Sequence, residues 1–192
     1  MSEYLRRAGT GTLADGARLV WSVADGHRGR RWRAVAALDD AVTHALLLEV
    51  DVAGRPDKVE LATPAGLLTL HPEEGSGRLH GNVVTAAGVR HVALAWGPEH
   101  GLEVEGRPIA SAVTAHHLAS SVAVGEGKTV QVVVIGPDLS VVESTRRYAR
   151  LGEGEWRVES TADGTPPWIL RIDARGVPHL PDDAEAWPLE LD

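Results

Sequence analysis

The stretch VQVVVIGPDLSVVESTRRYARL, residues 130–151, decides the fold of this chain. A nearly continuous apolar run ends at Gly136-Pro137-Asp138, and a second extended-looking segment with three arginines and a tyrosine follows. The glycine and proline could open a ligand loop at the end of a buried parallel strand, as in an α/β enzyme. They could also form a corner between two antiparallel strands. Residues 136–139 suit a β-turn, because proline at the second position already has the required φ. We therefore interpret residues 130–135 as a strand buried on both faces, lying centrally in a sheet.

Alternation of apolar and polar residues with a period of two recurs along the chain and predicts strands. In residues 44–52, for example, Leu46, Leu48 and Val50 share one face, whereas Glu49 and Asp51 share the other. Comparable segments cover residues 18–24, 30–38, 58–63, 90–96, 155–160 and 168–173. Turn signals rich in Gly and Pro separate them at roughly the 8–12-residue spacing of all-β proteins.

These patterns predict an all-β fold of a dozen or more strands, shaped as a spiral β-roll or a partly open antiparallel barrel. We expect residues 1–192 to form a single domain, with 18–181 as the roll and 182–192 as an acidic C-terminal tail. One segment, residues 109–123, is compatible with a helix by composition and equally with an extended conformation.

Composition and charge exclude several classes of protein. The 27 acidic residues outnumber the 19 Lys and Arg, and the resulting net charge of −8 argues against a general nucleic-acid binder. Cysteine is absent, which excludes disulfides and thiolate metal sites. The N-terminal residues lack the apolar region of a secretory signal, and no apolar run approaches the roughly 20 residues of a membrane span. We expect a cytoplasmic protein without stable membrane insertion.

The order and character of these segments resemble the glycolipid-binding family of bacterial proteins, whose function is inferred from the shape of their spiral β-roll. Residues 135–151, IGPDLSVVESTRRYARL, resemble the family's Pro-Asp-Leu-x-Val strand entry, which precedes an aromatic residue near an arginine. Residues 168–181, WILRIDARGVPHLP, resemble its closing segment. The family's double arginine is replaced here by His116 and His117, and its acidic signature is reduced to LEVEGRP at residues 102–108. The resemblance implies the roll fold and an amphiphilic ligand.

We therefore expect non-catalytic binding of a glycolipid, a lysophospholipid or a similar amphiphile in the concave interior of the roll, without cofactor or metal. The many Ala and Val at strand positions could leave room for an acyl chain. Two tryptophans on apolar strand faces would line the wall, and arginine with tyrosine would hold the head group at the mouth. The expected ligand-binding residues are Trp96, Trp156, His117, Arg146, Arg147 and Tyr148. The alternative interpretation makes the arginines a solvated strand face and the tryptophans core residues.

Two other functions remain open on the sequence. A hydrolase of small esters or glycosides would use His117 with Ser120 or Ser121, although the Gly-x-Ser-x-Gly and His-Glu-x-x-His motifs are absent. At most one of the neighbours His116 and His117 can face inward from a strand, where successive side chains alternate. A roll filled by its own side chains would instead serve as a scaffold for protein interaction.

Four further histidines, His71, His80, His91 and His100, are spaced 9, 11 and 9 residues apart. Such spacing could gather them on adjacent hairpins as a metal site. We interpret them instead as surface and loop histidines, because His71 and His100 lie in the turn-like segments HPEE and PEHG.

Overall fold

A computed structural model describes residues 6–161, 164–180 and 184–188. It divides the chain into two compact units, one formed by residues 1–95 with 180–192 and the other by residues 96–179. The described residues contain fourteen strands and a single helix, which confirms the predicted all-β class. The single-domain organisation stays a prediction.

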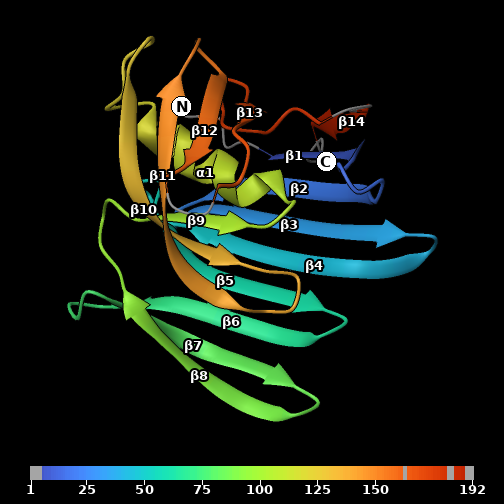
Figure 1. Ribbon diagram of the computed structural model, residues 1–192. Helices are drawn as coiled ribbons and strands as arrows, with labels where there is room; N and C mark the ends of the chain where they lie inside the picture. Colours follow the sequence, from blue (N-terminus) through green and yellow to red (C-terminus); the bar gives the residue numbers. More distant parts are fainter. Residues whose placement is uncertain (1–5, 162–163, 181–183, 189–192) are drawn as a thin grey trace. The chain divides into compact units, whose positions relative to one another are not determined.

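The first unit is one antiparallel sheet of nine strands, in the order β14-β1-β2-β3-β4-β5-β6-β7-β8. Strands β2 to β8 lie side by side in chain order (Figure 1). Each is connected to the next by a short turn, so neighbours in the sequence are neighbours in the sheet. The strands are β1 (Arg6–Thr12), β2 (Arg18–Gly26), β3 (Gly29–Leu38), β4 (Ala41–Val50), β5 (Pro56–Thr63), β6 (Gly66–Glu73), β7 (Arg78–Thr85), β8 (Gly88–Ala95) and β14 (Ala184–Pro188).

The two ends of the chain meet in this sheet, where Arg7 on β1 is opposite Pro188 on β14. The sheet therefore extends on both sides beyond the predicted limits of 18 and 181. Of the predicted C-terminal tail, residues 182–183 and 189–192 lie outside the described residues.

One face of the nine-stranded sheet is a core of apolar side chains at alternate positions. Trp32, Leu48 and Leu70 are among its fully buried members, and the ring of Trp21 lies 6.2 Å from that of Trp32. The period of two in the sequence produces this face directly, because successive side chains of a strand point to opposite sides of the sheet.

The second unit is a five-stranded sheet covered on one face by a helix. The strand order is β13-β12-β11-β10-β9, and all neighbours are antiparallel except β9 and β10. These two parallel strands are connected through the helix, as parallel neighbours require a crossover. The elements are β9 (Gly101–Val104), α1 (Pro108–Leu118), β10 (Gly127–Ile135), β11 (Val141–Arg150), β12 (Glu155–Ser160) and β13 (Trp168–Arg171).

The turn that follows β10 is the antiparallel corner expected from the sequence. The amide of Leu139 donates to the carbonyl of Gly136 at 3.0 Å, and the amide of Gly136 donates to Ser140 at 3.0 Å. Leu139 closes the turn with a φ of 63° and is fully buried. Strand β10 lies between β9 and β11, and residues 132–135 are buried on both faces. The predicted interior strand is thus confirmed, with burial on both faces over residues 132–135, whereas Gln131 is exposed.

Helix α1 resolves the ambiguity of residues 109–123. Pro108 occupies the start of the helix, where its missing N–H and fixed φ are tolerated, and Gly106 precedes it with a φ of 67°. The helix buries Ala112, Ala115 and Leu118 in a shared core with the sheet. Because residues 116 and 117 are helical, the strand geometry assumed for His116 and His117 is wrong.

Arg150 on β11 holds the end of this helix. Its guanidinium donates to the carbonyls of Ala119 at 2.9 Å and Val122 at 3.0 Å, and it lies 5.7 Å from the ring centre of Trp156. A cation at the C-terminal end of a helix satisfies carbonyls that lack an intrahelical partner. No helix in the described part of the chain has the length and hydrophobicity that crossing a membrane requires.

Candidate functional site

All six residues expected to bind a ligand lie in the second unit, but they occupy three different places. Arg146, Tyr148 and Trp156 project from the sheet face that α1 covers. Arg147, between two of them on β11, projects from the other face and is exposed. Trp96 and His117 lie elsewhere, in the segment before β9 and in the last turn of α1. The structure therefore brings three of the six together.

Arg146 is buried and its charge is balanced locally. Its Nε donates to a carboxylate oxygen of Glu103 at 2.9 Å, and its Nη1 donates to the hydroxyls of Ser144 at 2.7 Å and Ser160 at 3.0 Å. The side chain of Arg146 is 4% exposed and that of Glu103 is 10% exposed. An arginine whose contacts join three strands, β9, β11 and β12, in this way stabilises the sheet, and an incoming head group would have to displace Glu103.

Tyr148 and Trp156 pack edge to face, with ring centres 6.4 Å apart, and both are fully buried. Burial raises the pKa of Tyr148, and the negative charge of Glu103 adds to the shift. The hydroxyls of Ser111 and Thr114 and the charge of Arg146 oppose it. No described group gives the Tyr148 hydroxyl a hydrogen bond of good geometry. Because neither ring has exposed surface, both residues are part of the hydrophobic core of the second unit and do not line an open cavity.

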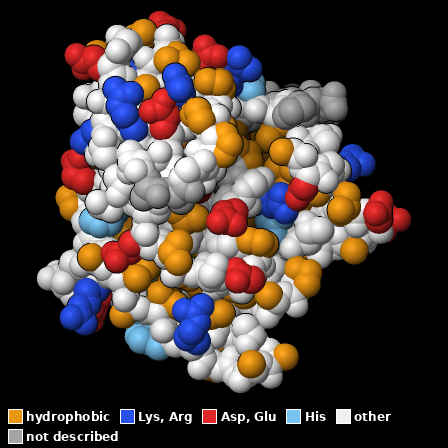
Figure 2. All heavy atoms as spheres, in the orientation of Figure 1, with side chains coloured by type: hydrophobic (Ala, Val, Ile, Leu, Met, Phe, Trp, Pro, Cys, Tyr) orange, Lys and Arg blue, Asp and Glu red, His pale blue; other side chains and the backbone are white. Residues whose placement is uncertain are grey.

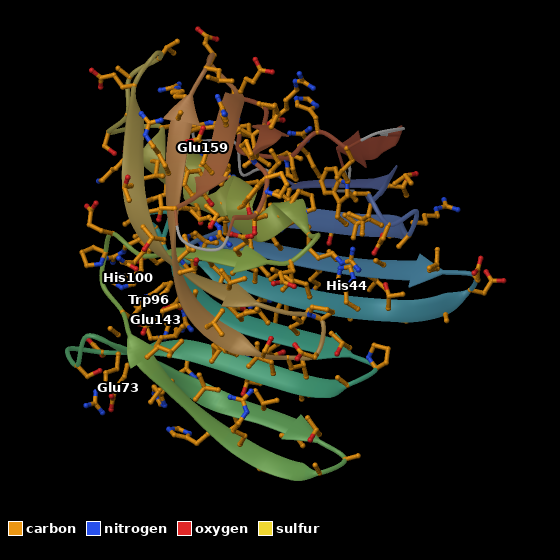
Figure 3. All side chains as sticks on the ribbon, viewed as in Figure 1. His44, Glu73, Trp96, His100, Glu143 and Glu159 are labelled. Atoms are coloured by element: carbon orange, nitrogen blue, oxygen red, sulfur yellow. The ribbon has the colours of Figure 1, made fainter. Side chains whose placement is uncertain are left out.

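Trp96 and His117 have charged and aromatic neighbours at a less buried place. The rings of Trp96 and His100 lie 5.5 Å apart, and Figure 3 shows both on the segment that precedes β9. Glu99 in the same segment forms an ion pair with Lys128, which holds the pKa of Glu99 below its ordinary value, and His117 adds a smaller effect. The arrangement is an exposed ion pair beside two partly buried rings.

Ser120 and Ser121, the serines considered for hydrolysis, form hydrogen bonds at the C-terminal end of α1. The hydroxyl of Ser120 donates to the backbone carbonyl of His117 at 3.1 Å, and that of Ser121 donates to Leu118 at 3.2 Å. Hydroxyls engaged with backbone carbonyls in this way are positioned as helix-terminal hydrogen bonds.

Three of the four spaced histidines come together, on the exposed face of the first sheet. His71 and His80 are opposite each other on β6 and β7 with ring centres 4.1 Å apart, and His80 and His91 are 6.3 Å apart. His71 lies within a strand and not in a turn, which corrects the interpretation of HPEE. His100 belongs to the other unit. No group of three or more His, Asp or Glu in the described residues is arranged to hold a metal ion.

The feature that sequence reasoning missed is an apolar row across this exposed face. We call the solvent-exposed side of the nine-stranded sheet the open face. On it, one ladder of directly opposed residues crosses seven strands, β2 to β8, and every member is apolar. This apolar row consists of Val20, Val35, Ala45, Ala62, Leu67, Val84 and Val89.

The members of the apolar row with larger side chains are well exposed. Val20, Val35, Leu67, Val84 and Val89 have exposed fractions between 43% and 70%. Exposed apolar residues are ordinary when they are scattered, but a contiguous set indicates a surface that another molecule covers. Sequence signals for it existed, since the apolar pairs Val83-Val84 and Leu67-Leu68 break the alternation and place an apolar side chain on both faces.

Charged side chains of both signs are mixed on the side of the molecule that Figure 2 presents. Figure 2 shows acidic and basic residues interspersed with hydrophobic ones on the side of the molecule that it presents, without a large patch of one sign. A surface of this kind gives no continuous track for a phosphate backbone.

No protein-family model matches the sequence, and no curated protein sequence is similar to it at a significant level. Among solved structures, a DUF1089 family protein from Pseudomonas aeruginosa is similar in fold, with a TM-score of 0.56 and 16% sequence identity. The match covers 95% of this chain and 91% of that one. The chain therefore shares its fold, along nearly its whole length, with a DUF1089 family protein.

Proposed function

We propose that the protein binds a lipid or similar amphiphile without turning it over, and that the ligand's apolar part lies along the apolar row of the open face. The observation that carries the proposal is the continuity of that row across seven neighbouring strands. The resemblance of residues 135–151 to the glycolipid-binding family supports the same class of ligand.

The dimensions of the row suit an acyl chain. Seven strands define six inter-strand steps of about 4.8 Å, so the row is about 29 Å long along the sheet. The hydrocarbon core of a bilayer, which contains two leaflets, is about 30 Å thick. The row is therefore longer than one acyl chain at its depth in a membrane, and a single lipid can lie along it.

The apolar contact energy that the row offers to a ligand is modest. Fully burying a Val or Leu side chain contributes about 1.5–3 kcal/mol, so covering a half-exposed one contributes about 1 kcal/mol. The five larger members of the row together give about 5 kcal/mol before the cost of association. This corresponds to weak binding of single molecules and stronger binding of an extended lipid surface.

This proposal keeps the ligand class expected from the sequence and moves the site. Three of the residues expected to contact the ligand, Arg146, Tyr148 and Trp156, are buried under α1. A ligand could touch them only if the helix moved away from the sheet. The open face needs no such rearrangement, because its apolar side chains are already in contact with solvent.

Titration with a fluorescent, zwitterionic lysophosphatidylcholine tests the proposal. The variant Val35→Gln/Val84→Gln removes apolar contact at two positions of the row, and we expect its affinity to fall about 10-fold or more. The matched control Val124→Gln/Val142→Gln changes two valines of similar exposure, 54% and 52%, in the other unit, and should bind like the unmodified protein. Equal affinity of the two variants would contradict the placement of the ligand on the apolar row. A lack of binding by the unmodified protein would contradict the proposal that it binds amphiphiles.

A further inference from the structure

We infer that the open face docks on bilayers that contain anionic phospholipid, and that this docking strengthens as the pH falls. The inference rests on the proposed function and names the head group and its regulation. Its basis is the distribution of charge on the open face, which differs in sign from that of the whole chain.

The open face is locally basic in an acidic protein. On β2 to β8 it carries five Lys or Arg and three Glu, a balance of 5 − 3 = +2, whereas the net charge of the chain is −8. The residues are Arg18, Arg31, Arg33, Lys58, Arg78, Glu49, Glu60 and Glu73. Two of the glutamates are neutralised by neighbours, since Arg31 binds Glu49 at 2.7 Å and Lys58 binds Glu60 at 2.7 Å.

Two arginines flank the apolar row and are available to an anion. Arg18 precedes Val20 by two positions on β2, and Arg33 precedes Val35 by two positions on β3. The register places Val20 opposite Val35, so the arginines stand on opposite sides of that apolar pair. Both are exposed, and neither forms an ion pair with a described residue. Arginine suits phosphate because its planar guanidinium can donate two parallel hydrogen bonds.

The histidine group at the other end of the face supplies charge that depends on pH. His71, His80 and His91 lie on β6, β7 and β8, the same strands that carry Leu67, Val84 and Val89. Histidine gains a positive charge as the pH falls from about 8 to about 5. Each of these rings that gains a proton adds one positive charge to the open face.

The charged and polar groups that face these rings do not reverse this sign. They are Lys58 and Glu60 on β5, which form an ion pair, Glu73 on β6, and Arg78 and Asn82 on β7, with Glu73 opposite Arg78 in the register. On β8 the facing residue is Ala93, opposite His80. The amide oxygen Oδ1 of Asn82 lies 3.3 Å from Nδ1 of His91 and accepts a hydrogen bond when that nitrogen carries a proton. Each acid among them has a cation beside it, so protonation of the histidines adds uncompensated positive charge.

A second copy of this chain fits the open face less well than an anionic bilayer does. A two-fold symmetric contact would place the arginines and histidines of one copy against the basic face of the other. Like charges opposed in this way disfavour association, whereas phosphate groups neutralise them. The combination of an apolar row with flanking cations matches a surface whose apolar chains lie beneath anionic head groups.

Co-sedimentation with vesicles of phosphatidylcholine alone, or with phosphatidylglycerol added, tests the inference at pH 8 and pH 5.5. We expect the partition coefficient to be higher on the anionic vesicles and to fall about 30-fold in Arg18→Gln/Arg33→Gln, at about 5-fold per cation lost. The control Arg157→Gln/Arg171→Gln removes two exposed arginines of the other unit and should leave binding unchanged. Acidification should strengthen binding on the order of 100-fold, and His71→Gln/His80→Gln/His91→Gln should remove most of that gain.

The outcomes separate the inference from the function on which it rests. Equal partition on neutral and anionic vesicles, or equal losses in the two arginine variants, would overturn the anionic head group while leaving amphiphile binding intact. A pH effect that persists in the triple histidine variant would overturn the regulation by these rings. Absence of binding to every vesicle and to lysophosphatidylcholine would overturn the proposed function itself.

Discussion

Removal of Glu103 should destabilise the second unit more than any change of a surface charge. The guanidinium of Arg146 is almost completely buried, and Glu103 is its anionic partner at 2.9 Å. In Glu103→Ala the buried guanidinium would lose this carboxylate and keep its hydrogen bonds to the hydroxyls of Ser144 and Ser160. Breaking a buried ion pair by removing one partner costs about 3–5 kcal/mol, because the remaining charge stays desolvated. We expect a loss of that size in the free energy of unfolding.

The paired variant Glu103→Met/Arg146→Met separates this effect from simple loss of packing. It removes both charges and keeps apolar volume, so we expect its stability to lie within about 2 kcal/mol of the unmodified protein. Urea unfolding followed by tryptophan emission measures both variants, and Trp156 reports from the same unit. A loss below about 1 kcal/mol in Glu103→Ala would show that water solvates the pair. A double variant as unstable as the single one would show that packing, and not charge, governs the site.

Three further predictions concern the second unit. The pKa of Tyr148 is raised in the folded state, so its contribution to the free energy of unfolding is fully present below the ordinary tyrosine pKa of about 10 and should decline as the pH rises above it. Tyr148→Phe should remove this alkaline decline in urea titrations. An unchanged decline would show that other groups cause it. Leu139 has a positive φ, which costs a non-glycine residue about 1–2 kcal/mol, so Leu139→Gly should destabilise no more than Leu139→Ala despite its smaller side chain; a clearly less stable glycine variant in thermal melts would refute the strain. Gly101→Ala should cost about 1–3 kcal/mol, since its Cβ would lie 2.6 Å from the Thr114 methyl on α1, and circular dichroism melts showing no loss would mean that the helix yields.

Much of the first sheet could be predicted because its information is local. Residues 31–34 alternate, with Trp32 and Ala34 on the buried face and Arg31 and Arg33 on the other, and they lie in β3. The tight turns between neighbouring strands then define the order of the sheet. The sequence carries this kind of pairing within a few tens of residues, so periodicity and turn chemistry suffice.

The second unit was harder because its decisive contacts are distant in sequence. Pro108 was visible, but it was interpreted as part of a turn signal and not as the first residue of a helix. The pairing of Glu103 with Arg146 joins residues 43 positions apart, and no local pattern indicates it. As a result, an arginine expected at the mouth of a cavity is instead buried between strands.

The open face was missed for a different reason. The period of two predicts which face of each strand packs in the core, but it says nothing about how residues on the other face line up between strands. Val35 and Val84 are, in the sequence alone, single interruptions of the alternation of apolar and polar residues. The apolar row becomes visible only when the register aligns such interruptions across seven strands. Register depends on bulges such as the one between Ala36 and Ala37, which a single sequence does not reveal.

Site-specific labelling on the open face tests the central claim most directly. Since the chain has no cysteine, Val84→Cys and Val142→Cys each accept a single environment-sensitive fluorophore, one on the apolar row and one on an exposed strand of the other unit. The account predicts that a lysophospholipid shifts the emission of the label at position 84 to shorter wavelength and leaves the label at position 142 unchanged. An unchanged emission at position 84, or equal shifts at both positions, would contradict it.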